Sequence, residues 1–296
     1  MESEKCRALL CAIDKGSITA AAETMGYTIS GISRMMAALE NELGFPLLRR
    51  GREGVTPTRE CLHLLPTIRE LVAQAEQCRQ MAGELRGLVS GTIAVAAFSS
   101  VATHWLPNMI CRFQKDFPDI DFEVLMGGYP EIEEWILEGR ADYGFLRLPA
   151  RTDLETLCLE EDELMVILSP EHPLAQLDRV PVEALQDQPF ILLDKAGDRD
   201  RDIMHVFERS GIVPQIRFST LDDYAVMSMV EHELGVSILP SLILKRIPYR
   251  IVSRPLACPC FRRIGLAMRP GDSLSPAARR FLAYLPYRSD KALFEN

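Results

Sequence analysis

Residues 17–58 read SITAAAETMGYTISGISRMMAALENELGFPLLRRGREGVTPT, and this stretch decides the fold of the N-terminal region. Small residues at 20–22 suit a short, closely packed helix, which Gly26 ends because glycine readily adopts the left-handed conformation of a helix C-terminus. Thr28 or Ser30 can cap a second helix. The apolar positions of that helix keep helical spacing: Ile32, Met35, Met36, Leu39 and Leu43. This pattern predicts a helix-turn-helix, which either enters the major groove of DNA or serves packing alone.

The flanking segments complete the predicted domain, which we place at residues 1–58. A first helix over 4–14 carries Cys6, Leu9, Leu10 and Ile13 on one face. The segment 49–56, with glycines at 51 and 54, predicts a two-stranded wing. We expect Thr56 to cap a long helix with Pro57 at its first position, where a missing N–H costs nothing.

The same stretch resembles the N-terminal domain of the LysR-type transcriptional regulators. The shared elements are Gly16-Ser17-Ile18-Thr19, Ala21-Ala22-Glu23, Ser33-Arg34, Leu39-Glu40-Asn41-Glu42-Leu43-Gly44, Leu47-Leu48-Arg49-Arg50 and Thr56-Pro57. The resemblance implies a regulator that binds double-stranded DNA. The residues it places against DNA are Thr28, Ile29, Ser30, Ser33 and Arg34 in the second helix, and Arg50 and Arg52 in the wing.

Ile29 departs from the family pattern, because many members carry glutamine at the matching position. An isoleucine side chain cannot hydrogen-bond a base edge, although it can contact a thymine methyl. We therefore expect the half-site sequence to differ from that of its relatives while the docking mode is kept.

The charge distribution limits how strongly one such domain binds. Residues 1–60 contain eight Lys and Arg and eight Asp and Glu, so the net charge of −9 belongs entirely to the rest of the chain. The basic side chains at 34, 49, 50 and 52 form a local phosphate-contacting patch rather than a basic domain. We expect weak binding by a single domain, which makes dimerisation important.

A linker helix is predicted over 59–90. Apolar positions follow each other at intervals of four and three, which is a heptad seam typical of a coiled coil: Leu64, Ile68, Leu71, Ala75, Cys78, Ala82 and Leu85. The alternative is a helix packed on its own domain. Pro66 should bend the helix near its start. LysR-type proteins place their dimerising helix here, so the resemblance implies a homodimer or homotetramer.

The remaining chain, residues 91–296, alternates short apolar strands with helices, which predicts an α/β domain with mainly parallel sheets. The segments expected to form strands are 92–97, 121–126, 141–146, 163–168, 190–193, 216–218 and 236–239; those expected to form helices are 105–117, 131–138, 222–233, 276–285 and one from about 200. Landmarks such as Glu138-Gly139-Arg140-Ala141-Asp142 and Leu234-Gly235-Val236 resemble the LysR effector domain. The resemblance implies two lobes like those of periplasmic binding proteins, lobe I at about 91–162 and 265–296 and lobe II at about 163–264.

A cleft between two such lobes is a natural site for a small-molecule effector. Loops of the family pocket match Ser99, Ser100, Gly128, Arg147 and Thr220. The serines can receive an anion at a helix start or simply cap the helix. Arg147 can grip a carboxylate or form a salt bridge, and Thr220 with Asp223 resembles a capping box. Acidic residues at 198, 200, 222 and 223 either pair with Arg199 and Arg201 or accept an amine of the ligand, so the identity of the effector stays open.

Other functions find less support in the sequence. No nucleophile-elbow, phosphate-loop or dinucleotide motif favours an enzyme, including a cysteine hydrolase. The N-terminus lacks the apolar core of a signal peptide and no run of 18 apolar residues occurs, so we expect a cytoplasmic protein with no membrane partner. The eight cysteines are interpreted as small buried hydrophobes, and a redox sensor built on Cys258 and Cys260 would have poor disulfide geometry. We expect no metal or other cofactor, and RNA polymerase is a further candidate partner.

Overall fold

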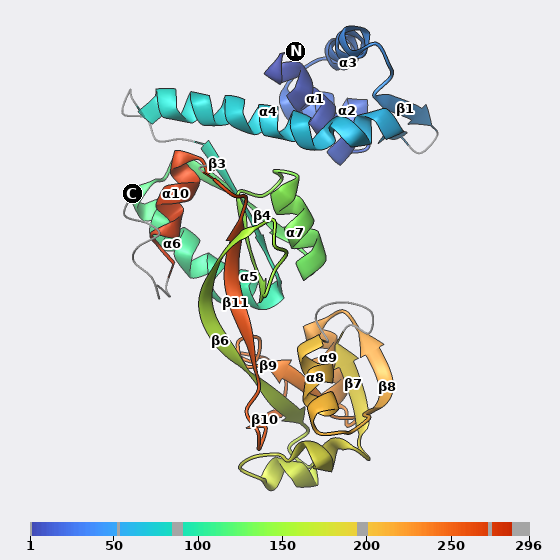
Figure 1. Cartoon of the computed structure of the whole chain (residues 1–296), viewed down its shortest axis with the longest axis vertical. Coiled ribbons are helices and arrows are strands. Elements are labelled where there is room, and N and C mark those ends of the chain that lie inside the picture. Colours follow the sequence, from blue (N-terminus) through green and yellow to red (C-terminus); the bar gives the residue numbers. More distant parts are fainter. Residues whose placement is uncertain (1, 52–53, 85–90, 194–200, 272–273, 286–296) are drawn as a thin grey trace.

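The computed structural model describes residues 2–51, 54–84, 91–193, 201–271 and 274–285. It places a helical N-terminal domain and a long helix at one end of an elongated molecule, above two α/β lobes that follow each other along the long axis (Figure 1). The predicted positions Arg52 and Leu85 lie outside the described residues, as do Asp198 and Asp200.

The N-terminal domain forms as the sequence predicts. Its elements are α1 (Ser3–Asp14), α2 (Ile18–Met25), α3 (Ile29–Leu43), β1 (Leu48–Gly51) and β2 (Gly54–Pro57). Ser17 caps α2, Gly26 ends it with φ +70°, and Thr28 caps α3 by accepting a hydrogen bond from the Gly31 N–H at 3.0 Å. The helices enclose a core of residues that include Leu9, Ile32, Met36, Leu39 and Leu47.

The long helix α4 (Arg59–Glu84) begins at the start of the predicted segment 59–90, but the expected cap at Thr56 and first position at Pro57 are wrong. Thr56 and Pro57 belong to strand β2, and the cap is Thr58, whose hydroxyl accepts a hydrogen bond from the Cys61 N–H at 3.1 Å. The hydroxyl of Thr58 also donates to the Pro46 carbonyl, so the cap joins the helix to the loop before the wing.

The first part of the predicted heptad seam packs inside the N-terminal domain. Ile68 is only 1% exposed, and Leu64 and Leu71 pack against the same core. Ala75 is half-buried, whereas Cys78 and Ala82 are exposed. The predicted dimer contact of Ile68 is therefore wrong, because a side chain buried in the core of its own domain cannot also contact a second copy. A helical period of this kind also arises when a helix packs on its own domain.

Lobe I surrounds the parallel strands β3 (Gly91–Ala97), β4 (Ile120–Met126) and β5 (Tyr143–Leu148), with β3 pairing with both of the others. Its helices are α5 (Ser99–His104), α6 (Leu106–Asp116), α7 (Tyr129–Leu137) and α10 (Pro276–Leu282). Its core gathers aromatic side chains around Phe113, whose ring lies 5.2 Å from that of Phe281, edge to face. The closing helix α10 is thereby held on the lobe.

Lobe II contains the parallel pair β7 (Pro189–Leu193) and β8 (Gln215–Thr220), together with β9 (Ser237–Pro240) and β10 (Val252–Pro255). Its helices are α8 (Arg201–Arg209), α9 (Asp223–Glu231) and two short 3-10 segments, Pro173–Gln176 and Val182–Leu185. The expected strands and helices of this lobe are present, but β10 has no counterpart in the prediction.

Two long strands, β6 (Glu155–Leu168) and β11 (Phe261–Met268), connect the lobes. They pair antiparallel, β11 also pairs antiparallel with β5, and the strand order is β10-β6-β11-β5-β3-β4, with β9 on β6. The α/β class is confirmed, and the sheet that crosses between the lobes is mixed rather than parallel.

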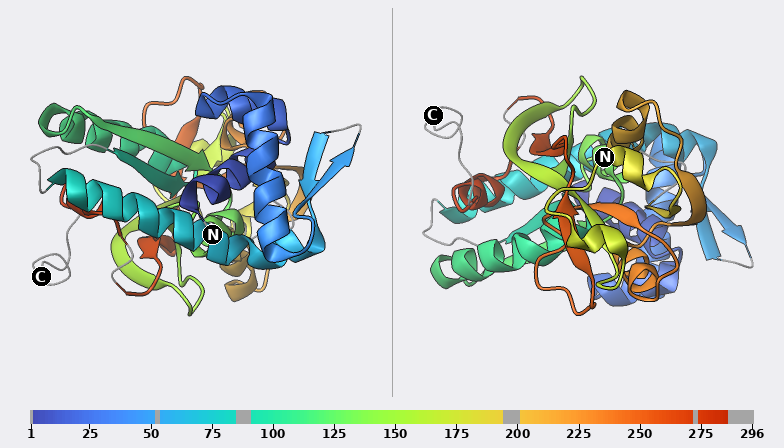
Figure 2. Two further views of the ribbon diagram at one scale, coloured as in Figure 1. Left: turned by 90° about the horizontal axis from the view of Figure 1, so that it is seen from above. Right: turned by 90° about the horizontal axis from the view of Figure 1, so that it is seen from below.

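The N-terminal domain contacts lobe I and leaves lobe II at the far end (Figure 1). The Gln77 side chain of α4 donates to the Leu274 carbonyl at 3.2 Å, and α4 packs on α10. The hairpin β1–β2 projects beyond the rest of the molecule when the chain is viewed from above (Figure 2). Among the described residues, no helix is both long and apolar enough to cross a membrane.

Candidate functional site

The candidate nucleic-acid interface lies on α3 and the wing. Ile29 is 52% exposed, Ser30 and Arg34 are exposed, and Ser33 is half-buried. Thr28 is exposed too, but its hydroxyl is used as the cap of α3. An exposed isoleucine at the start of a helix, beside a serine and an arginine, can meet base edges and phosphates together.

The wing is fixed to α3 by Glu40. The carboxylate of this residue accepts hydrogen bonds from the N–H groups of Leu47 at 2.8 Å and Leu48 at 3.2 Å. The hairpin then exposes Arg49 and Arg50. Because successive side chains of a strand point to opposite faces, the two arginines extend from opposite faces of the hairpin. Glu40 belongs to the sequence pattern described above, but that pattern does not reveal that its side chain anchors the wing.

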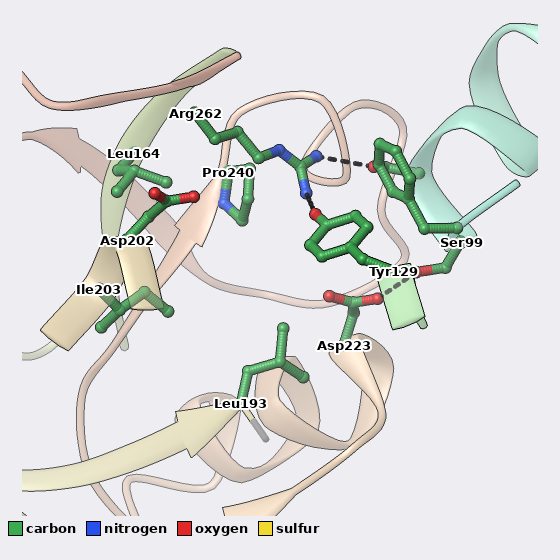
Figure 3. Close-up of a pocket in the computed structure, with 11 residues that line it drawn as sticks. Ser99, Tyr129, Leu164, Leu193, Asp202, Ile203, Asp223, Pro240 and Arg262 are labelled. Carbon is green, nitrogen blue, oxygen red and sulfur yellow. Dashed lines mark hydrogen bonds between the residues drawn. The ribbon is translucent and has the colours of Figure 1, made fainter. Parts of the chain in front are cut away.

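The second candidate site is a small cavity between the lobes (Figure 3). It is lined from lobe I by Phe98, Ser99, Ser100 and Tyr129, and from lobe II and the crossover strands by residues that include Asp202, Asp223 and Arg262. Its free volume is about 20 Å³, which is room for about one water molecule. The lobes therefore close on each other in this structure.

Two polar contacts hold the lobes together at this cavity. The hydroxyl of Ser99, at the start of α5, donates to the carboxylate of Asp223 on α9 (Figure 3). The guanidinium of Arg147, at the end of β5, pairs with Asp202 of α8 at 3.1 Å. Arg147 is only 5% exposed and lies over the Tyr129 ring, 5.8 Å from its centroid. Both contacts join side chains of lobe I to carboxylates of lobe II.

A buried network surrounds Arg262 on β11. Its guanidinium donates twice to Asp162, at 2.9 and 2.7 Å, once to the Tyr129 hydroxyl at 3.1 Å and once to the Ser100 hydroxyl at 2.8 Å. Burial alone would lower the pKa of Arg262, but Tyr129 and Asp162 outweigh burial and raise it. The second oxygen of Asp162 accepts from Ser241 and from the Leu242 N–H. The network therefore fixes both crossover strands to the cavity wall.

The predicted effector residues divide into two groups. Ser99 and Ser100 line the cavity, and Arg147 joins it through Asp202. Gly128 precedes α7 and Thr220 accepts from the Asp222 N–H, and neither lines the cavity. The capping-box prediction is wrong, because the cap of α9 is Asp222, which leaves Asp223 directed into the cavity.

Tyr129, Asp202 and Arg262 were missed in the sequence. No local motif surrounds them, and they meet only because β11 and α8 pack against lobe I. A cavity wall assembled from such distant segments leaves no spacing signal.

The cysteines lie away from the interlobe cavity. None of them forms a disulfide in this structure, and none is among the residues that line the cavity. Cys6 and Cys61 are buried as expected, and burial raises the pKa of Cys61 to about 11. The interpretation as buried hydrophobes is wrong for four exposed residues, Cys78, Cys111, Cys158 and Cys258. In the described ranges, no three His, Cys, Asp or Glu side chains gather as a metal site would require.

Comparison with known proteins identifies both halves of the chain. Residues 3–62 match the model of the bacterial regulatory helix-turn-helix proteins of the lysR family, and residues 86–288 match the LysR substrate binding domain. The chain belongs to the LysR family of DNA-binding transcriptional regulators. This LysR-type chain is 30% identical over 286 residues to the probable regulator LrrA of Synechococcus elongatus, with 96% of each chain covered.

Solved structures share the fold over nearly the whole length. Full-length OxyR of Pseudomonas aeruginosa superposes with a TM-score of 0.76 at 21% identity, covering 96% of this chain and 93% of the other. The LysR family regulator CbnR, in complex with its target DNA, superposes with a TM-score of 0.69 at 21% identity, covering 96% and 99%. The LysR-type regulator described here therefore has the family arrangement of a reading domain, a linker helix and a two-lobed effector domain.

Proposed function

We propose that this LysR-type regulator binds a two-fold-symmetric promoter site as a dimer or tetramer, and that a small molecule between the lobes controls that binding. The observation that carries the proposal is the pairing of an exposed α3 face with an arginine-bearing wing held to it by Glu40. Ile29, Ser30, Ser33 and Arg34 would meet the major groove, and Arg50 with Arg52 the adjacent backbone.

Dimerisation is part of the proposal because one reading domain carries little net charge. Exposed positions on α4 supply apolar surface for a second copy, among them Leu62, Cys78, Met81 and Ala82. Two linked domains would then match two half-sites in adjacent turns of DNA. CbnR, whose structure was solved with its target DNA, has the same fold.

The interlobe cavity supports the regulatory half of the proposal. It lies where the two lobes meet and is closed by contacts that a ligand can exchange, Ser99–Asp223 and Arg147–Asp202. The solved effector domain of QuiR holds shikimate and superposes with a TM-score of 0.60. We further propose that the protein acts in the cytoplasm and needs no metal or other cofactor.

The test is selection of binding sites from random DNA duplexes by the full-length protein, followed by footprinting. The proposal expects a protected site with two related half-sites about one helical turn apart. Arg34→Ala should lose the protection while the protein remains folded. Failure of the wild-type protein to enrich any duplex would overturn the proposal.

A further inference from the structure

Among the residues that the structure describes, the charges around the interlobe cavity are unequal. Three carboxylates lie in or next to its wall, those of Asp162, Asp202 and Asp223, against the guanidinium groups of Arg147 and Arg262. Arg262 is bound twice by Asp162, and Arg147 is paired with Asp202. Of these described side chains, both arginines thus have an aspartate partner, and Asp223 is the remaining carboxylate.

Asp223 is buried, with only 7% of its surface exposed. One of its oxygens accepts a hydrogen bond from the neutral hydroxyl of Ser99, and its carboxylate is directed into the cavity (Figure 3). Within the described part of the chain, no lysine or arginine forms an ion pair with it. A buried carboxylate without a cationic partner is unfavourable, and a cation brought by a ligand would remove that cost.

An effector whose only charged groups are carboxylates would have to bind the two arginines, which already have aspartate partners. To reach Arg147 it would have to displace Asp202, and to reach Arg262 it would have to displace Asp162, whose side chain is 2% exposed. Either exchange leaves an aspartate of the protein without its cation, in a place poorly reached by water. Because such an exchange replaces one carboxylate partner of the arginine by another, it would contribute little free energy of binding.

We propose that the effector carries an ammonium or guanidinium group that binds between Asp223 and Ser99. The inference rests on the proposed function, because it names the chemical class of the ligand for the same cavity. The cation would donate to the Asp223 carboxylate and to the Ser99 oxygen, replacing one direct contact between the lobes by a bridge through the ligand. Because the closed cavity holds about one water, the lobes must part to admit the ligand and close again around it.

A first measurement needs no ligand. Asp223→Asn keeps an oxygen that can accept from Ser99 and removes the buried charge. The full-length variant should therefore melt at the same temperature as the wild type or higher. The matched control is Asp178→Asn, an exposed aspartate of the same lobe. A lower melting temperature for Asp223→Asn alone would mean that the protein already stabilises this charge, for example through the N-terminus of α9, and would overturn the proposal.

The second measurement uses four probes with the same four-carbon chain: putrescine, γ-aminobutyrate, succinate and butanediol. Putrescine or γ-aminobutyrate should raise the melting temperature of the full-length protein by about 2 °C or more at saturating concentration. Asp223→Asn should lose at least about tenfold in affinity for that probe, and Asp178→Asn should keep it. Three outcomes would each overturn the proposal. These are stabilisation by succinate alone, no stabilisation by either amine, and stabilisation by an amine that is unchanged in Asp223→Asn.

Failure of this ligand proposal can be distinguished from failure of the proposed function. Binding of the selected DNA site by wild type and Asp223→Asn, measured without any probe, tests the regulator itself. DNA binding with no response to amines would overturn only the ligand class.

Discussion

The guanidinium of Arg69 on α4 lies 4.0 Å from the carboxylate of Glu138, the residue that follows α7 in lobe I. The same guanidinium pairs with Asp14 of α1 at 3.3 Å, so a single side chain contacts both domains. At its other end α7 begins with Tyr129, which accepts from Arg262 in the cavity wall. One short helix therefore reaches from the interlobe cavity to the contact with the DNA-reading domain.

Arg69→Ala should destabilise the full-length protein by about 1–2 kcal/mol, because it removes a buried guanidinium that serves two carboxylates. The control is Arg79→Ala on the same helix, whose exposed pair with Glu76 should contribute less than about 0.5 kcal/mol. Urea unfolding of both variants gives the comparison. Equal effects at the two positions would show that Arg69 does not join the domains.

Arg34→Ala should weaken binding to the selected DNA site at least about tenfold at low salt, because Arg34 is exposed on the reading helix and suits a phosphate or a guanine. Gel shifts at several salt concentrations should also give a salt slope smaller by about one. Arg217→Ala, an exposed arginine of lobe II, is the control for loss of charge alone. Equal affinities for wild type and Arg34→Ala would remove Arg34 from the interface.

Ile29 should supply part of the sequence preference through an apolar contact. Ile29→Ala is expected to reduce discrimination at one thymine of the half-site, at a cost of about 1 kcal/mol, and to leave the salt dependence unchanged. Binding to duplexes in which uracil replaces that thymine tests the idea, since uracil lacks the methyl group. A wild-type protein that binds both duplexes equally at every position would contradict it.

The N-terminal domain could be predicted in detail because its signals are local. Gly26 ends one helix and Thr28 starts the next within three residues, and the apolar spacing of α3 identifies its buried face. The predicted heptad seam of α4 shows where such reasoning from local spacing fails. Ile68 has the spacing of a coiled coil, yet the partner of that face is the core of its own domain. Periodicity reveals that a face is buried and not what buries it.

The cavity could be predicted only in part for a related reason. Ser99 lies directly after a strand, a position that sequence alone associates with ligands, and it lines the cavity. Arg262 and Asp162 are 100 residues apart and meet because β6 and β11 pair in antiparallel register, which no local pattern encodes. The strand β11 itself was missed, and with it the centre of the polar network.

Asp162→Asn should be strongly destabilising, by about 3–5 kcal/mol, because it leaves the charge of Arg262 buried without its carboxylate. The control is Glu171→Gln, which removes the acidic partner of Arg250 in an exposed pair and should change stability by less than about 0.5 kcal/mol. Chemical unfolding followed by circular dichroism provides the measurement. A mild effect of Asp162→Asn would show that Tyr129 and Ser100 suffice to hold Arg262.

Asp142 should make the stability of the protein sensitive to pH. It directly precedes β5, in the wall of a cavity of about 290 Å³ that Arg69 and Arg269 also line, and it accepts a hydrogen bond from the Ala94 N–H at 2.8 Å. Burial raises the pKa of this carboxyl to about 6, against an ordinary value of 3.8, although Ala94 and Arg269 act in the opposite direction.

Because the folded-state pKa of Asp142 is the higher one, protonation favours the fold. This contribution is fully present below about pH 4 and is lost as the pH rises through about 6. Asp142→Asn keeps an oxygen that can accept from the Ala94 N–H and carries no charge. The free energy of unfolding of this variant should therefore exceed that of the wild type by on the order of 1 kcal/mol near neutral pH and by little near pH 4. Thermal unfolding across this range checks the difference, with Asp178→Asn as the exposed control. A gap between wild type and Asp142→Asn that does not change with pH would show that the carboxyl titrates normally.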